Sequence, residues 1–252
     1  MTRSRPILPP GYRLLGYDSI GSTNDEAKRL ARDGAAEGTL LWAREQTAGR
    51  GRRGRTWVSP PGNLYASLIL RPDCSVAQAA QLGFVAAVAL GGVFGALCPT
   101  LGVTYKWPND VLANGRKIAG ILLESEVIRA GRLSFLVLGI GVNLTASPQV
   151  TEFPATSIVE EGLRPIPPKA MLEEFAGKFQ SWKTRWESEG FAPIRAAWLA
   201  AAISRGGPIR VRLATDCLHG DFLDIDGEGA LLLEVAGERR RVAAGEVFPV
   251  NR

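Results

Sequence analysis

A long stretch without charged side chains constrains this chain most. Residues 74–105 carry no charge and include the run LGFVAAVALGGVFGALC, which has to be buried in a bilayer or in a protein core. A membrane-spanning helix needs about 20 strongly apolar residues and is flanked by basic ones. This run is instead rich in Ala and Gly, follows Gln78 and Gln81, and ends at Pro99. We therefore predict a helix in the core of a globular domain, and no membrane partner.

The cysteine and histidine content excludes several kinds of site. Cys74, Cys98 and Cys217 are far apart and form no C-x-x-C pair, which argues against a disulfide framework and a cysteine zinc site. His219 is the only histidine, so a multi-histidine metal centre is excluded. The N-terminus has no apolar segment before its prolines and is not a signal peptide. We expect a cytoplasmic protein.

Hydrophobic periodicity predicts a mixture of helices and strands. The sequence around residues 22–34 fits a helix in which Thr23 and Glu26 form a capping box. Apolar residues at spacings of three and four predict a second helix over 171–186 with an aromatic core stripe, and a shorter one near 191–202. Strands are predicted at 39–43, 64–70, 103–107, 117–127 and 132–142, the last two as a hairpin with its turn at 129–131.

A composition break at residues 205–208, Arg-Gly-Gly-Pro, suits a domain boundary. Short strands follow at regular spacing, which suggests a small closed or nearly closed barrel. We predict these strands at 208–214, 220–226, 230–235 and 239–250. The expected domains are therefore 1–205 and 206–252.

Residues 46–57, QTAGRGRRGRTW, are suited to binding an anion. Glycines let backbone amides approach a phosphate, and the arginines supply planar, permanently charged donors. No G-K-[ST] follows, so the segment is not a Walker loop. With a net charge of +5, the loop by itself fits a small phosphate ligand and a nucleic acid equally well.

Further motifs decide between these readings. In order along the chain stand STN (22–24), EQTAGRGRRGRTW (45–57), KWPNDV (106–111), RKIAGILLE (116–124) and GIGVNL (139–144). This ordered set resembles the biotin protein ligase family. The resemblance implies an α+β fold, a mixed sheet with flanking helices similar to class II aminoacyl-tRNA synthetases, followed by a small SH3-like β-barrel.

The resemblance also implies the reaction. A member of this family joins biotin to ATP, with Mg²⁺, and passes the biotinyl group to a lysine of a biotin carboxyl carrier protein domain. The motifs begin at Ser22, which leaves no room for the N-terminal winged helix of larger members. We therefore expect no specific DNA binding, and either a monomer or a homodimer.

Site residues follow from the resemblance one by one. Biotin would be bound by Ser22, Thr23, Asn24, Gln46, Gly49, Arg50, Trp57, Lys117 and Gly120. ATP or the adenylate would be bound by Arg52, Arg55, Lys106, Asn109, Lys117 and Asn143, and the catalytic residues would be Lys117, Asp110 and Arg52. The Lys117 cation would offset the charge that accumulates when a carboxylate attacks phosphate.

Several of these roles have plainer alternatives. Ser22 and Thr23 also fit a helix cap, and Trp57 also fits core packing. Asp110 would serve magnesium or the attacking lysine amine, or would only occupy a turn. Lys106 would pair with phosphates or support that turn.

Two rival functions stay open at this point. One is a lipoate or octanoate ligase of the related families, which share the catalytic fold. The other is a basic nucleic-acid-binding module, although residues 49–56 contain no aromatic side chain for base stacking.

Overall fold

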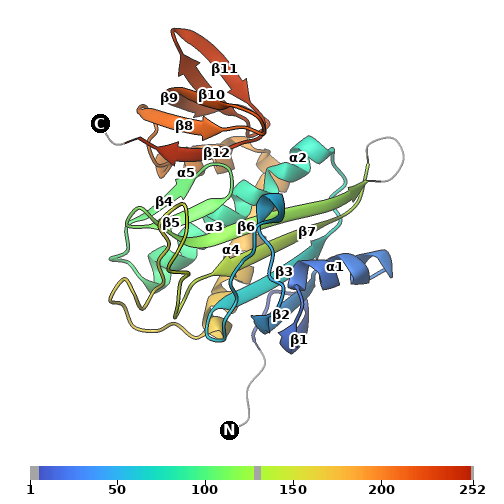
Figure 1. Ribbon diagram of the computed structural model, residues 1–252. Coiled ribbons are helices and arrows are strands. Elements are labelled where there is room, and N and C mark those ends of the chain that lie inside the picture. The colour runs from blue at the N-terminus through green and yellow to red at the C-terminus, as the bar shows by residue number, and fades with distance from the viewer. Residues whose placement is uncertain (1–5, 128–131, 251–252) are drawn as a thin grey trace.

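The computed structural model describes residues 6–127 and 132–250, and it has an α+β architecture. A seven-stranded mixed sheet with flanking helices is followed by a five-stranded antiparallel sheet that stands above it in Figure 1. The predicted fold class is therefore confirmed.

The large sheet has the strand order β1-β2-β3-β7-β6-β5-β4. Strands β1 and β2 are parallel, and all other neighbours are antiparallel. The strands are β1 (Arg13–Ile20), β2 (Thr39–Gln46), β3 (Leu64–Leu70), β4 (Val103–Lys106), β5 (Asp110–Ala113), β6 (Arg116–Val127) and β7 (Leu133–Val142). The predicted turn at 129–131 lies outside the described residues.

Two of these strands were not predicted from the sequence. β1, RLLGYDSI, contains Gly and Asp and has no clean alternation, because it is an edge strand paired on one side only. β5 has four residues, too few for a periodic signal, and it begins at Asp110 itself. The turn residues 107–109 therefore join two paired strands, which holds this site segment on the sheet.

The helices are α1 (Thr23–Arg32), α2 (Val76–Ala80), α3 (Leu82–Leu97), α4 (Pro168–Glu189) and α5 (Ala192–Ala200), with a 3-10 turn, η1, at Arg52–Gly54. The predicted core helix is thus divided into α2 and α3. The helical stretch Val76–Leu97 is long and apolar enough to cross a membrane, but 67% of its most apolar window is buried inside the protein, as a core helix requires.

The start of α1 differs from the prediction. Ser22, not Thr23, is the N-cap, and its hydroxyl accepts a hydrogen bond from the backbone N–H of Asp25. Glu26 forms an ion pair with Arg29 instead of completing a capping box. The reason is tertiary, because the Thr23 side chain is engaged by Gln46.

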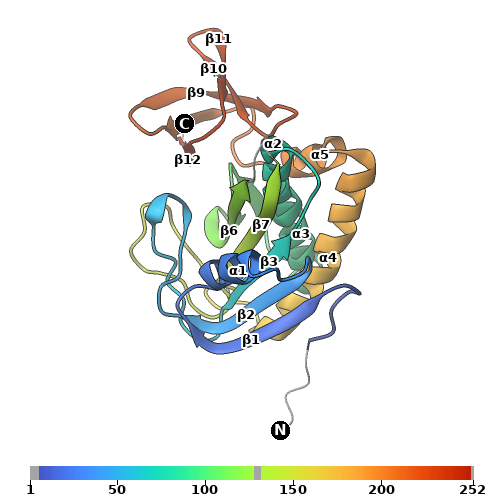
Figure 2. The ribbon, with the colours of Figure 1, turned by 90° about the vertical axis from the view of Figure 1, so that its right-hand side faces the viewer.

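Helices cover both faces of the large sheet, as Figure 2 shows. Helix α1 covers one face, where Ala27 and Ala31 pack with Leu41, Phe135 and Val137. Helices α3 and α4 cover the other face. The predicted aromatic stripe belongs to that core, and its residues Met171, Leu172, Phe175 and Phe179 are all buried.

The C-terminal sheet has the order β11-β10-β9-β8-β12, formed by β8 (Pro208–Arg212), β9 (Cys217–Ile225), β10 (Leu231–Val235), β11 (Glu238–Val242) and β12 (Glu246–Pro249). The predicted strand 239–250 is in fact two strands that pair with different neighbours, β10 and β8. A turn of this sheet contacts the core helices and the KWPN segment. Trp107 Nε1 donates to Gly229 O at 3.0 Å, and Gln81 Nε2 donates to Gly227 O at 2.9 Å.

Candidate active site

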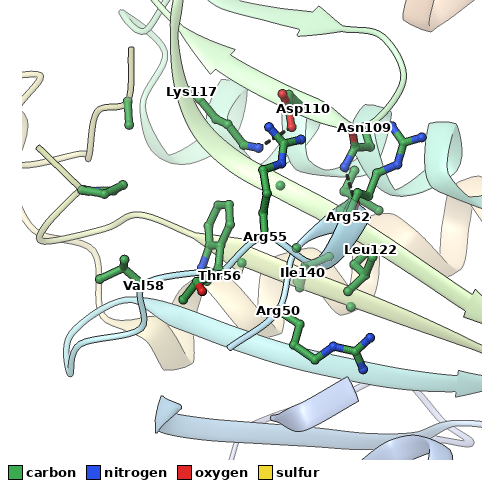
Figure 3. Close-up of a pocket in the computed structure, with 18 of the residues that line it drawn as sticks. Arg50, Arg52, Arg55, Thr56, Val58, Asn109, Asp110, Lys117, Leu122 and Ile140 are labelled. Carbon is green, nitrogen blue, oxygen red and sulfur yellow. Dashed lines mark hydrogen bonds and ion pairs between the residues drawn. The ribbon is translucent and has the colours of Figure 1, made fainter. Parts of the chain in front are cut away.

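A cavity of about 370 Å³ lies on the α1 face of the large sheet, beyond the N-terminus of that helix. It is lined by the arginine-rich loop within residues 46–57, strands β6 and β7, the segment 148–155 and one residue of the C-terminal sheet. The cavity is in the size range of small-molecule sites, about 300–1,000 Å³. Figure 3 shows Lys117, Asp110, Asn109 and the loop arginines around it.

Most of the predicted site residues line this cavity. They are Ser22, Thr23, Asn24, Gln46, Arg50, Arg52, Arg55, Trp57, Asn109, Asp110, Lys117, Gly120 and Asn143. Gly49 and Lys106 are not among the described lining residues. Gly49 instead closes the base of the loop, since its carbonyl accepts from Trp57 N at 2.9 Å. Ser22 and Asn143, which are 121 positions apart in the sequence, thus meet at one site.

The floor of the cavity is nearly bare backbone. Along β7, the residues facing α1 are apolar at Phe135 and Val137 and then glycine at 139 and 141, where the strand leaves the cover of the helix. Gly141 pairs with Gly120 of β6. The ring of Trp57 lies over this pair, and its indole N–H has no hydrogen-bond partner among the described residues. This N–H group is therefore buried against the strand backbone and is not exposed to the cavity.

A polar cluster forms one wall at the start of α1. Gln46 Oε1 accepts from the backbone N–H of Thr23 at 2.8 Å and from its hydroxyl at 3.0 Å. Gln46 Nε2 donates to Ser59 Oγ at 3.0 Å. Thr23 and Ser59 are buried and Gln46 is half-buried beside a helix N-terminus, whose dipole favours polar or anionic ligand groups.

Two lysines hold a buried aspartate on the other side of the cavity. Asp110 Oδ1 is 2.5 Å from Lys117 Nζ, and Asp110 Oδ2 is 2.8 Å from Lys106 Nζ. Burial alone would raise the pKa of Asp110, but the ammonium groups of Lys117 and Lys106 outweigh it and hold that pKa well below its ordinary value. Asp110 is therefore ionised, and Lys117, whose side chain is 22% exposed, is the cation that reaches the cavity.

Lys106 has a supporting position. It is 1% exposed, and besides Asp110 it donates to Val247 O of the C-terminal sheet at 3.3 Å. The rings of Phe153 and Phe248 pack against its ammonium group. Of the two alternatives from the sequence, this placement favours support of the turn over direct contact with phosphate.

The arginines of the loop point in different directions, as Figure 3 shows. Arg50 forms ion pairs with Asp25 and with Glu124, the latter at 3.2 Å. Arg52 donates to Asn109 Oδ1 at 3.3 Å, and Arg55 pairs with Glu246 at 2.6 Å. The loop is therefore held at three separate points around the cavity.

Several lining residues were missed by sequence reasoning. Glu246 is one, and nothing in its local sequence relates it to Arg55, which lies 191 residues earlier. Gly139 had a usable signal, since glycine at alternate positions of a strand marks a close approach. The remaining missed residues include Thr56, Val58, Ala66, Ile121, Leu122, Ile140 and segment 148–155, which offer mostly apolar or backbone contact.

Comparisons with known proteins agree with this arrangement. Residues 16–143 match the Biotin/lipoate A/B protein ligase family, and residues 206–248 match the Biotin protein ligase C terminal domain. A biotin--[acetyl-CoA-carboxylase] ligase from Paracoccus denitrificans is 45% identical over 233 residues, which cover 90% of this chain and 96% of that protein. A bifunctional ligase/repressor BirA from Bacillus subtilis is 35% identical, over 94% of this chain and 74% of that protein.

Solved structures show the same fold. A biotin protein ligase from Aquifex aeolicus, in complex with biotin and ATP, has a TM-score of 0.80 at 24% identity and covers 94% of this chain and 97% of its own. The Leishmania major enzyme in complex with biotinyl-5-AMP has a TM-score of 0.64 at 25% identity, over 94% and 100% of the two chains. By its sequence match over half its length and its near-complete alignment with a relative 45% identical, the chain belongs to the biotin/lipoate A/B protein ligase family.

Proposed function

We propose that this chain is a biotin–protein ligase that activates biotin with ATP and transfers it to a lysine of a carboxyl carrier protein. The observation that carries the proposal is one cavity with the Gln46 and Thr23 cluster on one wall and the paired Lys117 and Asp110 on another. The first suits the ureido group of biotin, and the second suits the place where a carboxylate meets a phosphate.

The reaction has two balanced steps. A carboxylate oxygen of biotin attacks the α-phosphorus of ATP, so an acyl–phosphate bond forms and pyrophosphate leaves. The neutral amine of the carrier lysine then attacks the acyl carbon, AMP leaves with the bonding electron pair, and the nitrogen loses a proton. In both steps we assign to Lys117 the stabilisation of negative charge on phosphate oxygens, and to Asp110 the positioning of its ammonium group, which the 2.5 Å ion pair supports.

Most of the residues that we assign to biotin line the cavity. We assign the ureido group to Ser22, Thr23 and Gln46, and the apolar rings and chain to Trp57. Asn24 supports the floor, where its amide lies within 3.0 Å of where a Gly139 Cβ would stand. Gly49 and Arg50 shape the loop above, and Gly120 leaves room for the Trp57 ring. These assignments rest on position and chemistry together.

The nucleotide residues lie at the other end. We assign phosphate contacts to Arg52 and Arg55, which carry permanent charge, and polar contacts to Asn109 and Asn143. Asn143 is 2% exposed and donates to Thr156 O at 3.1 Å, so its carbonyl oxygen stays available as an acceptor for an adenine amine. Lys106 would act on the phosphates only through Asp110.

The residues present do not fit a protein-bound Mg²⁺ at Asp110. Both of its oxygens face lysine ammonium groups, which a divalent cation would have to displace. Among the described residues, no group of three His, Cys, Asp or Glu side chains could hold a metal ion. We therefore assign the magnesium to the nucleotide, as part of Mg-ATP, and no step is routed through a protein metal site.

The proposal extends to organisation and partners. We propose residues 1–205 as the catalytic unit and 206–252 as the second domain, which contributes Glu246 to the cavity wall. The partner is a biotin carboxyl carrier domain, and the enzyme acts as a monomer or a homodimer without specific DNA binding. Its three free cysteines suit a reducing cytoplasm.

The deciding experiment is direct. The protein is mixed with Mg-ATP, a carboxylase carrier domain and either biotin, lipoate or octanoate, and the carrier mass is measured. One biotinyl addition is expected, with lipoate and octanoate poorer by about 10⁴, because a site built for hydrogen bonds is left unpaired by a ligand without them. No biotinyl addition would overturn the proposal, and comparable lipoate addition would reassign the substrate.

A further inference from the structure

A chain of hydrogen bonds runs on the α1 face of the large sheet, from Glu124 of β6 to the Thr23 hydroxyl. Asn24 Nδ2 is 2.9 Å from Glu124 Oε2, and Asn24 Oδ1 is 2.6 Å from Ser67 Oγ. Ser67 Oγ is in turn 2.8 Å from Thr23 Oγ1. Ser67 is fully buried on β3, and neither Ser67 nor Glu124 is among the described residues that line the cavity. The chain therefore reaches the ligand site through Thr23 and Asn24, which both line the cavity.

The Glu124 carboxylate, at the outer end of the hydrogen-bond chain, determines which groups donate in the Asn24–Glu124 and Ser67–Asn24 hydrogen bonds. Glu124 lies between Lys28 Nζ at 2.8 Å and Arg50 Nη2 at 3.2 Å, so it is an anion and can only accept. Asn24 consequently turns its NH₂ group toward Glu124, where the second N–H also meets a backbone carbonyl. Its carbonyl oxygen then faces Ser67, and an amide oxygen can only accept. The single proton of Ser67 is thereby committed to Asn24.

The direction passes on to Thr23. Its hydroxyl lies against Ser67 Oγ, whose proton is committed, and against Gln46 Oε1 at 3.0 Å. Gln46 Oε1 is fixed as an acceptor because it also takes the backbone N–H of Thr23 at 2.8 Å. The Thr23 hydroxyl therefore has two acceptors beside it, Gln46 Oε1 and Ser67 Oγ, and donates its single proton to one of them rather than to the cavity. A lone pair on Thr23 Oγ1 is left for the cavity.

We infer that Ser67 and Glu124 are positioning residues that determine ligand specificity by fixing the Thr23 hydroxyl as an acceptor. Next to that acceptor, Gln46 Nε2 donates one hydrogen to Ser59 Oγ, and its second hydrogen has no partner among the residues that the structure describes. An acceptor and a donor side by side match a ligand edge in which N–H adjoins C=O, as in a cyclic urea. The inference rests on the proposed function, because it takes biotin as the ligand.

The test uses ligands that differ from biotin by one atom. The probes are the two oxazolidinone analogues, in each of which one ring N–H of the ureido group is replaced by oxygen. In the wild type, the analogue whose oxygen faces Thr23 sets two acceptors against each other, so we expect a kcat/KM for adenylate formation about 100-fold or more below that of biotin. The other analogue serves as a reference for the general effect of the ring change.

Two variants remove, in different ways, the constraint on which way the hydrogen bonds from Asn24 to Thr23 are donated. Glu124→Gln replaces the obligatory acceptor by an amide that can also donate, so the whole chain can reverse and Thr23 can turn its proton to the cavity. Ser67→Ala removes one of the two inward acceptors of Thr23. In both we expect the preference for biotin over the discriminated analogue to fall about tenfold, through KM with kcat for biotin largely retained.

Matched controls separate this effect from general damage. Asp25→Asn removes the other carboxylate that pairs with Lys28 and Arg50. This carboxylate is not the hydrogen-bond partner of the Asn24 amide, which is Glu124. Ser157→Ala removes another fully buried serine hydroxyl. This hydroxyl accepts a hydrogen bond from Glu160 N at 3.2 Å and is not part of the hydrogen-bond chain that ends at Thr23. Both controls should keep the wild-type preference, with folding checked by thermal melts.

The double variant of Ser67→Ala and Glu124→Gln provides a second test of whether the two residues act through the same hydrogen-bond chain. Since Ser67→Ala already interrupts the chain, adding Glu124→Gln should change the preference by no more than the larger single effect. Additive effects, an unchanged preference in both single variants, or a wild type that accepts both analogues as well as biotin would overturn the inference. If Ser67→Ala does not fold, Glu124→Gln, whose side chain is 20% exposed, decides alone. A wild type inactive with biotin itself would instead overturn the proposed function.

Discussion

The indole of Trp57 lies so close to Gly141 that a Cβ atom on this glycine would stand 2.5 Å from both ring Cε2 and Nε1. A Cβ atom on Gly120, the register partner of Gly141, would stand 2.8 Å from Cζ3 of the same ring. The other side of the relationship is electrostatic, since Lys117 Nζ lies 5.3 Å from the ring centroid. The position of the ring, and with it the surroundings of the Lys117 ammonium group, thus depends on the absence of side chains at Gly120 and Gly141.

Gly141→Ala should therefore damage ligand binding while the sheet stays folded. The new methyl group displaces Trp57, so we expect KM for biotin to rise by about tenfold, the effect of roughly 1–3 kcal/mol of misfit in a pocket. Steady-state adenylate formation measures this. The matched control is Gly95→Ala on α3, where a Cβ meets nothing within 4 Å. The control should raise the free energy of unfolding by about 0.5–1 kcal/mol with unchanged KM. A normal KM in Gly141→Ala would mean that Trp57 does not contact biotin.

Lys117→Met should slow adenylate formation far more than it weakens biotin binding. The cation is most useful as charge develops on the phosphate, and loss of one such contact costs about 10²–10³ in rate. Pyrophosphate release gives the rate, and isothermal titration gives the affinity for biotin. Lys183→Met on α4, which loses ion pairs to Glu37 and to Glu187, is the control and should keep the wild-type rate. Equal losses in rate and affinity would argue that Lys117 only binds.

Stability should decline in acid partly because of Glu246. Burial alone would raise the pKa of this carboxyl, but hydrogen bonds from Arg212 and Arg55 outweigh it and lower the pKa below the ordinary 4.5. A carboxylate with a lower pKa in the folded state stabilises the fold above its unfolded pKa, and this stabilisation is lost as the pH falls through the folded value.

In urea unfolding followed from about pH 7 to pH 3, Glu246→Gln should therefore show a shallower decline below about pH 5 than the wild type. Glu238→Gln, which changes an exposed carboxylate paired with Arg240, should follow the wild-type curve. Parallel curves for the wild type and Glu246→Gln would show that the ion pairs of Glu246 with Arg55 and Arg212 do not stabilise the fold.

The double substitution Arg52→Ser and Arg55→Ser should loosen the loop over the adenylate. These side chains hold the loop to Asn109 and Glu246, and a mixed anhydride reacts readily with water and stray amines unless the site excludes them. We expect carrier labelling to fall and labelling of added albumin to rise, as seen on a streptavidin blot. Arg44→Ser, whose partner is the exposed Asp18, controls for charge loss. Clean carrier-only labelling by the double variant would place retention elsewhere.

The local patterns of the chain were enough for many of its elements. Alternation and periodicity predicted β2, β3, β6 and β7 and the long helix α4, because a buried face imposes a repeat that survives in one sequence. The same patterns failed where burial was not periodic. Edge strand β1 and the short β5 carry no repeat, and the core helix divides near Gln81, whose amide is held by Trp186 and by Gly227.

The sequence by itself determined which chemical groups the site contains, since the loop arginines, Lys117 and Asp110 stand in recognisable motifs. Only the tertiary structure decided how they are used. Lys106 and Lys117 have the same charge, yet one is enclosed by the C-terminal sheet and the other reaches the cavity. Ser67 reads as one polar residue in an apolar strand, and Glu246 as one acid among many. Their contacts join segments far apart in the chain, which no local pattern encodes.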